Sequence, residues 1–236
     1  PMGSMLLLED ISAEKRMKST MSRYMDPGLA DKLMGEGSEL LGGQDSVATV
    51  LFSDIRSFTT LSEELGAQGI VSLLNDYFTL MVEIVAEEGG MLDNRQRADF
   101  NQQPIDIGIG LNTGHVVSGN IGSPKRMDYT VIGDGVNLAA RLESATKQYG
   151  AHILISEFTM AELKSSYRHR LVDNVVVKGK TKPVGVYELL DYHTEESYPN
   201  MIDALGAFRD GMECYQAARW DDALNRFGGV LEMNPA

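Results

Sequence analysis

The apolar positions of this chain follow two periods, which together predict a mixture of strands and helices. A β-branched and apolar run at 47–54 is typical of a short buried strand. Apolar residues then recur every three or four positions from Ile70 to Val85, which predicts a helix with one buried face. Alternation of apolar and polar residues at 105–111 predicts another strand, and we expect a hairpin turn at 112–114.

The same two periods recur along the rest of the chain. Further strands are expected at 127–132, 152–156, 171–177 and 184–190, and further helices at 136–149 and 157–163. Ahead of the first strand, two polar helical stretches and a glycine-rich linker are expected at 12–24, 28–34 and 35–43. Strands and helices that alternate in this way predict an α/β or α+β sheet domain.

Composition narrows the class of protein. The chain has 236 residues, 43% of them hydrophobic, which is enough for one sizeable core with appended elements. Its one cysteine, Cys214, excludes an intrachain disulfide and fits a reducing cytoplasm. No apolar run approaches the roughly 20 residues of a membrane helix and no secretory signal is evident, so we expect a cytoplasmic protein with no membrane partner. A net charge of −13 argues against nucleic acid as a partner.

Asp54 is the first candidate site residue. It ends the strand expected at 47–54, and a carboxylate at a strand end can hold a divalent cation. The backbone amides that follow, from Ile55 to Thr59, can bind phosphate oxygens where a helix begins. The alternative is that Asp54 caps this helix, which is the commoner role of an aspartate in such a position.

Asn137 and Arg141 form a second candidate pair. They are four residues apart on one helix and therefore share a face, while Leu138 and Leu142 define a different, apolar face. An amide and a guanidinium so placed can orient a sugar oxygen and offset charge on a transferring phosphate. The alternative is an ordinary solvated helix face.

Lys178 and Lys180 lie between two expected strands, where they can neutralise a triphosphate. The alternative is a charged turn without a ligand. The sequence has no Walker loop and no dinucleotide fingerprint, so neither of these common phosphate-binding folds is supported.

Four segments resemble, in order, the signatures of class III adenylyl cyclase catalytic domains. They are LFSDIRSFT at 51–59, IGIGLNTG at 107–114, DYTVIGDGVNLAAR at 128–141 and VKG at 177–179. Four linked motifs are far more specific than any one of them. The resemblance implies an α+β fold with a ferredoxin-like βαββαβ core and extra strands. It also implies a homodimer, in which two antiparallel copies hold ATP in the groove between them.

The resemblance also assigns roles to individual residues. One copy supplies Asp54 as a ligand to two Mg²⁺ or Mn²⁺ ions and the Ile55 carbonyl to one of them. The amides that bind phosphate belong to Ile55, Arg56, Ser57, Phe58 and Thr59. The other copy supplies Thr130 to the purine, Asn137 to the ribose, Arg141 to the reacting phosphate and Lys178 to the triphosphate tail. The implied reaction is attack of the ribose 3′-hydroxyl on the α-phosphate of ATP, which releases cyclic AMP and pyrophosphate.

Thr130 bears on the choice of base. In this family the position seven residues before Asn137 tends to be aspartate or threonine in adenylyl cyclases and smaller or cysteine in guanylyl cyclases. A threonine hydroxyl can pair with the exocyclic amine of adenine, which favours ATP. A guanylyl cyclase remains the alternative.

The sequence departs from the family pattern after Asp93. There the family continues with a base-reading lysine or glutamate, a second metal-binding aspartate and a long helix, whereas this chain continues with Asn94 and soon reaches the next motif. We interpret the departure as a segment of the natural protein that is absent from this sequence. If the deletion is genuine, the chain lacks its second metal ligand and is expected to be an inactive dimerising module, a pseudo-cyclase.

The flanks resemble known neighbours of such catalytic domains. Residues 1–4 are typical of a cloning scar, and 5–43 resemble the end of a PAS-type sensor and the transducer helices that join sensors to cyclases. The catalytic domain is expected at 44–193. Residues 196–236 have a tetratricopeptide-like pattern, which suggests a protein partner and further repeats; the alternative is a plain helical hairpin.

Overall fold

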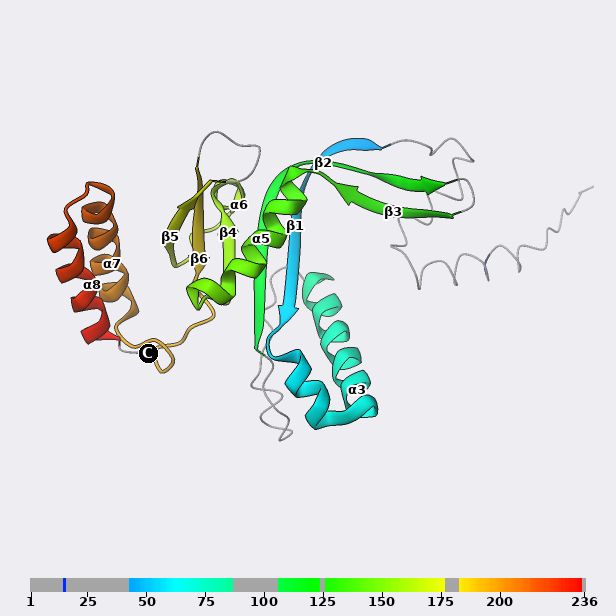
Figure 1. Cartoon of the computed structure of the whole chain (residues 1–236), viewed down its shortest axis with the longest axis horizontal. Helices are drawn as coiled ribbons and strands as arrows, with labels where there is room; N and C mark the ends of the chain where they lie inside the picture. Colours follow the sequence, from blue (N-terminus) through cyan, green and yellow to red (C-terminus); the bar gives the residue numbers. More distant parts are fainter. Residues whose placement is uncertain (1–14, 16–42, 87–105, 124–125, 177–182, 235–236) are drawn as a thin grey trace, which may run out of the picture. The chain divides into compact units, whose positions relative to one another are not determined.

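The computed structural model describes residues 15, 43–86, 106–123, 126–176 and 183–234. These residues form strands and helices in alternation (Figure 1), which confirms the predicted α+β class. The elements in chain order are β1 (Gln44–Ile55), α3 (Phe58–Ala86), β2 (Ile107–Ser123), β3 (Arg126–Ile132), α5 (Asp134–Tyr149), β4 (Ile153–Ser156), α6 (Glu157–Glu162), β5 (His169–Val175), β6 (Val184–Leu189), α7 (Met201–Gln216) and α8 (Trp220–Met233).

One sheet contains all six strands of the described residues. The order across it is β1-β2-β4-β6-β5, and β3 pairs with β2 off this path. β2 and β4 run parallel, whereas the β2–β3, β4–β6 and β5–β6 pairs are antiparallel. The chain divides into two compact units, one of residues 1–46 and 117–132 and the other of 47–116 and 133–236.

The hairpin turn predicted at 112–114 is wrong, because β2 continues through these residues to Ser123. Asn112 is buried, with 2% of its surface exposed. Its Nδ2 donates to the Gly135 carbonyl at 3.0 Å, and its Oδ1 accepts from Ser156 Oγ at 2.7 Å. The Asn112 amide is therefore satisfied inside the protein, and no turn is needed to bring it to solvent.

Leu73 and Tyr77 of the predicted apolar face of α3 pack against β1 and β2, whereas Phe78, which was predicted on the same face, is 58% exposed. Ile55, Leu73, Tyr77 and Ile107 form a buried cluster, and Ile109 lies at its margin. The end of β1 is thereby anchored, since Ile55 is one residue beyond Asp54 and belongs to this cluster.

The other face of β2 lies against α5. A side chain at Gly110 would meet the Glu143 backbone nitrogen at 2.1 Å, and one at Gly108 would meet Thr146 Oγ1 at 2.3 Å. Successive residues of a strand point to opposite faces, so α3 and α5 cover opposite faces of β2. α5 also contributes Leu138 and Leu142 to a second buried cluster, whose other members are Ala151, Leu154, Val184 and Val186.

Gly110→Ala is expected to destabilise the protein by about 3 kcal/mol, because its methyl group would clash with the α5 backbone, which cannot rotate away. The matched control is Gly206→Ala in α7, where a Cβ would meet nothing within 4 Å. That change is expected to leave stability unchanged or raise it by up to about 1 kcal/mol. Urea unfolding followed by circular dichroism measures both, and equal midpoints would contradict the close approach of α5.

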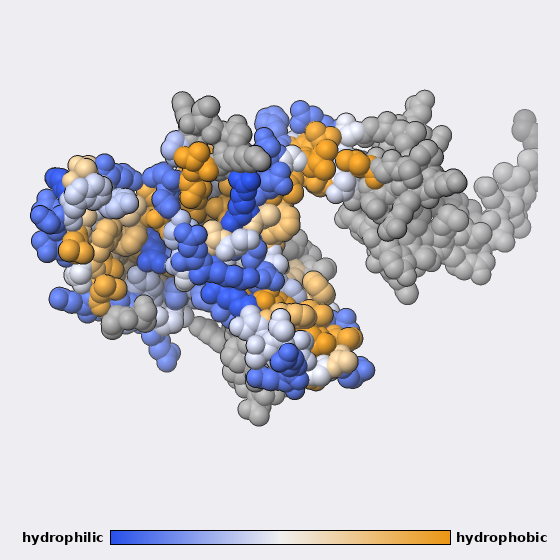
Figure 2. Space-filling view, in the orientation of Figure 1, coloured by the Kyte–Doolittle hydropathy of each residue, from blue (hydrophilic) through white to orange (hydrophobic). Residues whose placement is uncertain are grey.

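The C-terminal segment forms the predicted helical pair. α7 and α8 pack closely, and a Cβ at Gly211 would meet the Phe227 ring at 2.6 Å. Arg170 of β5 joins the pair to the sheet, because its guanidinium lies 5.2 Å from the centre of the Phe208 ring in α7. Figure 2 shows apolar areas over α7 and α8, where Ile202 and Leu224 are 79% and 73% exposed.

None of the helices in the described ranges has the length and apolar character needed to cross a bilayer.

Candidate active site

Asp54 lies at the end of β1 with its carboxylate half exposed. The strand is fixed on both sides of it, since Ser53 Oγ lies 3.0 Å from the Tyr77 hydroxyl and Ile55 is buried. The carboxylate itself contacts a cation, because Lys147 Nζ of α5 donates to Asp54 Oδ2 at 2.7 Å. This hydrogen bond, followed by the charge of Asp54, raises the pKa of the Lys147 ammonium.

The turn after Asp54 is held by Arg56. The backbone amide of Arg56 donates to the Asp106 carbonyl at 2.8 Å, and its guanidinium contacts the Ala151 carbonyl and the Asp106 carboxylate. The amide predicted to bind phosphate at this position is therefore already used within the chain. The structure instead gives Arg56 a structural role, which joins β1 to the residues that precede β2 and β4.

The next three candidate residues, Ser57, Phe58 and Thr59, start α3. Ser57 has φ of 54°, in the left-handed region, and its carbonyl accepts from the Leu61 amide. The first turn of α3 carries no acidic residue. A helix N-terminus without an acidic residue in its first turn favours anions, so this turn remains suited to phosphate oxygens.

α5 is held rigidly where it carries the second candidate pair. Its buried residues Leu138, Ala139, Leu142 and Thr146 face the sheet. At its C-terminal end the Tyr149 hydroxyl donates to Asp173 Oδ2 of β5. Burial, followed by this hydrogen bond, raises the pKa of Tyr149 to about 12.

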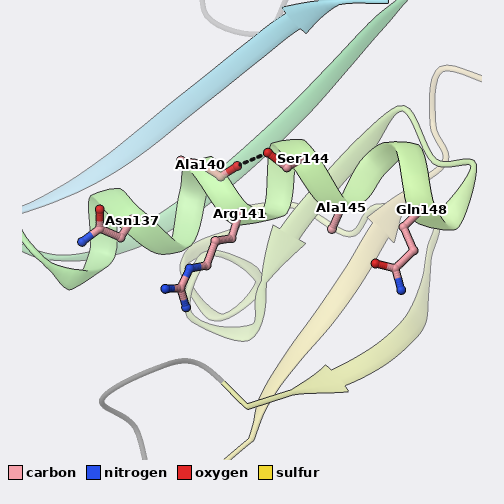
Figure 3. Close-up of a pocket in the computed structure, with 6 residues that line it drawn as sticks. All are labelled: Asn137, Ala140, Arg141, Ser144, Ala145 and Gln148. Carbon is pink, nitrogen blue, oxygen red and sulfur yellow. Dashed lines mark hydrogen bonds between the residues drawn. The ribbon is translucent and has the colours of Figure 1, made fainter.

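Asn137 and Arg141 are exposed on the outer side of α5, as the sequence predicts. They line an open hollow of about 470 Å³ whose other lining residues are Ala140, Ser144, Ala145 and Gln148. In Figure 3 the side chains of Asn137, Arg141 and Gln148 project from the helix, while Ser144 Oγ donates back to the Ala140 carbonyl. In the part of the chain that the structure describes, the Asn137 and Arg141 side chains have no hydrogen-bond or ion-pair partner.

Asp54 contacts a different side of α5 from the one that carries Arg141. Lys147, its partner, follows Arg141 by six residues, which places the two side chains about 120° apart around the helix axis. Within one chain, Asp54 and Arg141 therefore lie on different parts of the surface.

The remaining predicted site residues are placed only in part. Thr130 is half-buried on β3, opposite Gly119 of β2. Lys178 and the segment after Asp93 lie outside the described residues.

Lys147 is a residue of the site that no sequence motif singles out. A basic residue in the last turn of a helix is common, because it complements the helix dipole, and nothing local indicates that its partner is Asp54, 93 positions earlier. The sequence indicates only that Lys147 lies in the same helix as Arg141, which belongs to the motif at 128–141.

The groups around Asp54 fit a hard divalent cation. Mg²⁺ in proteins is typically held by one or two carboxylates together with substrate phosphates and water. Asp54 supplies one exposed carboxylate, which in this structure pairs with the Lys147 ammonium at 2.7 Å. No group of three or more His, Cys, Asp or Glu side chains suited to a metal occurs in the described ranges.

The chain belongs to the adenylate and guanylate cyclase catalytic domain family, whose pattern matches residues 43–93 and 89–191. The match consists of two pieces that overlap at residues 89–93, which is where the sequence departs from the family pattern. The chain is similar to an adenylate cyclase of Anabaena cylindrica, with 36% identity over 181 aligned positions that cover 60% of this chain and 36% of the relative. The alignment has 181 positions, which is dozens more than the 60% of this chain's 236 residues that it covers. The relative therefore carries residues that have no counterpart in this chain.

Solved structures of both nucleotide specificities are similar to this chain. The adenylyl cyclase CyaB of P. aeruginosa is 33% identical with a TM-score of 0.52, covering 64% of this chain and 97% of that one. The guanylyl cyclase Cya2 is 31% identical with a TM-score of 0.51, covering 63% and 94%. This chain spans between 12% and 36% of the lengths of the adenylate cyclases that it resembles among curated proteins.

Proposed function

We propose that this chain is an adenylyl cyclase that converts ATP to cyclic AMP and pyrophosphate in a site shared by two copies. One observation carries the proposal: Asp54 and the Asn137–Arg141 pair occupy different sides of the same unit, and each is exposed. A symmetric dimer can bring Asp54 of one copy to Arg141 of the other, and each such dimer then has two sites.

Each side chain then has a role set by its chemistry. Asp54 and the Ile55 carbonyl hold the divalent cations, and the amides of Ser57, Phe58 and Thr59 receive the phosphates. Two Mg²⁺ or Mn²⁺ ions, when bound, lower the pKa of the ribose 3′-hydroxyl and neutralise the phosphates. In the second copy, Lys178 binds the triphosphate tail.

The reaction forms the bond between the 3′-oxygen and the α-phosphorus, releases the 3′-hydroxyl proton to solvent water, and breaks the bond from that phosphorus to the bridging oxygen of pyrophosphate. Asn137 of the second copy orients the ribose for in-line attack, and Arg141 offsets the charge that gathers on the α-phosphate. Little covalent chemistry falls to the protein, so positioning and electrostatics determine the rate.

Thr130 supports ATP over GTP, because its hydroxyl can accept a hydrogen bond from the amine of adenine. A guanylyl cyclase is the second candidate, since the guanylyl cyclase Cya2 resembles this chain almost as closely as the adenylyl cyclase CyaB does. The pseudo-cyclase is the third, and the two-piece family match at 89–93 favours it if no residues are missing there.

The purified chain with ATP and Mn²⁺ is expected to release cyclic AMP and pyrophosphate in equal amounts, measured by chromatography and a coupled pyrophosphate assay. Faster turnover of GTP would replace the proposal with a guanylyl cyclase. A dimer that turns over neither nucleotide would indicate a pseudo-cyclase. The intact mass of the natural protein distinguishes the causes of such inactivity, because an absent helix would add kilodaltons to the mass expected from this sequence.

We further propose that the flanking segments regulate the enzyme. All of 5–43 except Lys15 and Gly43 lies outside the described residues, so the sensor and transducer assignments rest on the sequence pattern alone. The α7–α8 pair is compatible with a tetratricopeptide-like unit and with the exposure of Ile202 and Leu224, which suit a further helix or a protein partner.

A further inference from the structure

Lys147 is a charged group in direct contact with the proposed metal ligand, and the proposed function gives it no role. Its ammonium lies 2.7 Å from Asp54 Oδ2, so the cation that neutralises Asp54 belongs to the protein itself. Both side chains are about half exposed, at 56% and 49%. Ion pairs this exposed contribute little to stability, which makes the contact easy to break.

A second carboxylate on α5 can receive the lysine. Glu143 precedes Lys147 by four residues, the spacing at which a glutamate and a following lysine pair on a helix. Glu143 Oε1 is buried and, among the residues that the structure describes, has no hydrogen-bond partner, although Oε2 accepts from Ser144 Oγ at 3.2 Å. A buried carboxylate oxygen without a partner is costly, so a nearby ammonium group is a favourable occupant.

We propose that Lys147 acts as an internal cation that holds Asp54 in the absence of metal and moves to Glu143 when a divalent ion binds Asp54. This inference rests on the proposed function, because it requires Asp54 to be a metal ligand. The lysine then sets the metal affinity of the free protein, since each ion must compete with a charge already in place. When the metal ion displaces Lys147 from Asp54, the lysine gains Glu143 as a partner. The free-energy cost of the displacement is therefore lower than if the ammonium group were left unpaired.

The test is the binding of Mn²⁺ without nucleotide, followed by the electron paramagnetic resonance signal of free Mn²⁺. Lys147→Met is expected to tighten binding about three- to tenfold, because it removes both the competing ion pair and a repulsive charge. Lys164→Met is the matched control: Lys164 is exposed, and its replacement changes the net charge equally without touching Asp54. It is expected to change the affinity less than about twofold.

Glu143→Gln tests the second position of the lysine. It is expected to weaken Mn²⁺ binding about twofold to threefold in the wild-type chain and to have no effect in the Lys147→Met chain. If Glu143 attracted the metal directly, its loss would weaken binding equally in both backgrounds, and that outcome would overturn the two-position account.

Asp54→Asn separates the failure of this inference from the failure of the proposed function. If Mn²⁺ binding requires Asp54 but Lys147→Met behaves like Lys164→Met, the inference is wrong and the metal site stands. If Asp54→Asn leaves Mn²⁺ binding unchanged, the ion does not bind Asp54, and the inference and the proposed metal site both fall.

Discussion

Replacing Arg141 by alanine is expected to lower kcat for ATP about 10²- to 10³-fold, while KM changes less than about threefold. This is the effect of removing one hydrogen-bond donor that stabilises charge in the transition state. Arg141 is exposed on α5 and its guanidinium has no partner within the described part of the chain, so its loss leaves no buried group unsatisfied. The fold is therefore expected to remain intact. Steady-state kinetics of cyclic AMP formation separate the two constants.

Arg209→Ala is the matched control for this prediction. Arg209 is also an exposed arginine within a helix, α7, so the substitution makes the same change in charge and helix propensity away from the site. It is expected to leave kcat and KM unchanged. Equal activity of the Arg141→Ala variant would remove Arg141 from the mechanism, and a rise in KM alone would assign it to substrate binding.

Replacing Asp54 by asparagine is expected to reduce turnover about 10³-fold or more, because the amide cannot provide the charge that holds the divalent cation. The shape of the side chain is conserved, and the lost pair with Lys147 is exposed, so the melting temperature is expected to stay close to that of the unaltered chain. Initial rates over a range of Mn²⁺ concentrations measure the effect. A defect that saturating Mn²⁺ removes would show that Asp54 tunes affinity without being essential.

Asp76→Asn provides the control for charge. Asp76 is exposed on α3, and the change from carboxylate to amide is identical. Its turnover and Mn²⁺ dependence are expected to match those of the unaltered chain. A similar loss in both variants would mean that net charge, rather than a specific metal ligand, controls activity.

Sequence periodicity predicted the elements that position the site because burial acts locally. The apolar residues of α3 and α5 repeat with the helical period, so the outward direction of Asn137 and Arg141 could be predicted from Leu138 and Leu142 alone. The place of Asp54 at a strand end followed in the same way from the apolar run that precedes it.

The sequence does not reveal polar contacts between distant residues, and the wrong hairpin prediction came from one such set of contacts. Asn112, Thr113 and Gly114 have the composition of a turn, yet Asn112 finds its partners at Gly135 and Ser156, which no local pattern reveals. The Arg56 amide, one of those proposed to bind phosphate, donates to the Asp106 carbonyl, a contact that the sequence also does not reveal. Hydrogen bonds of this kind depend on how elements meet, and local hydrophobic periodicity carries no record of them.

The most direct test of the shared site mixes two inactive variants, Asp54→Asn and Arg141→Ala, after unfolding and refolding them together. If each site takes Asp54 from one copy and Arg141 from the other, a mixed dimer has one intact site and one doubly altered site. Random pairing then restores about a quarter of the unaltered specific activity. Mixed dimers, shown by co-purification of a tagged copy, that remain no more active than either parent would contradict the account.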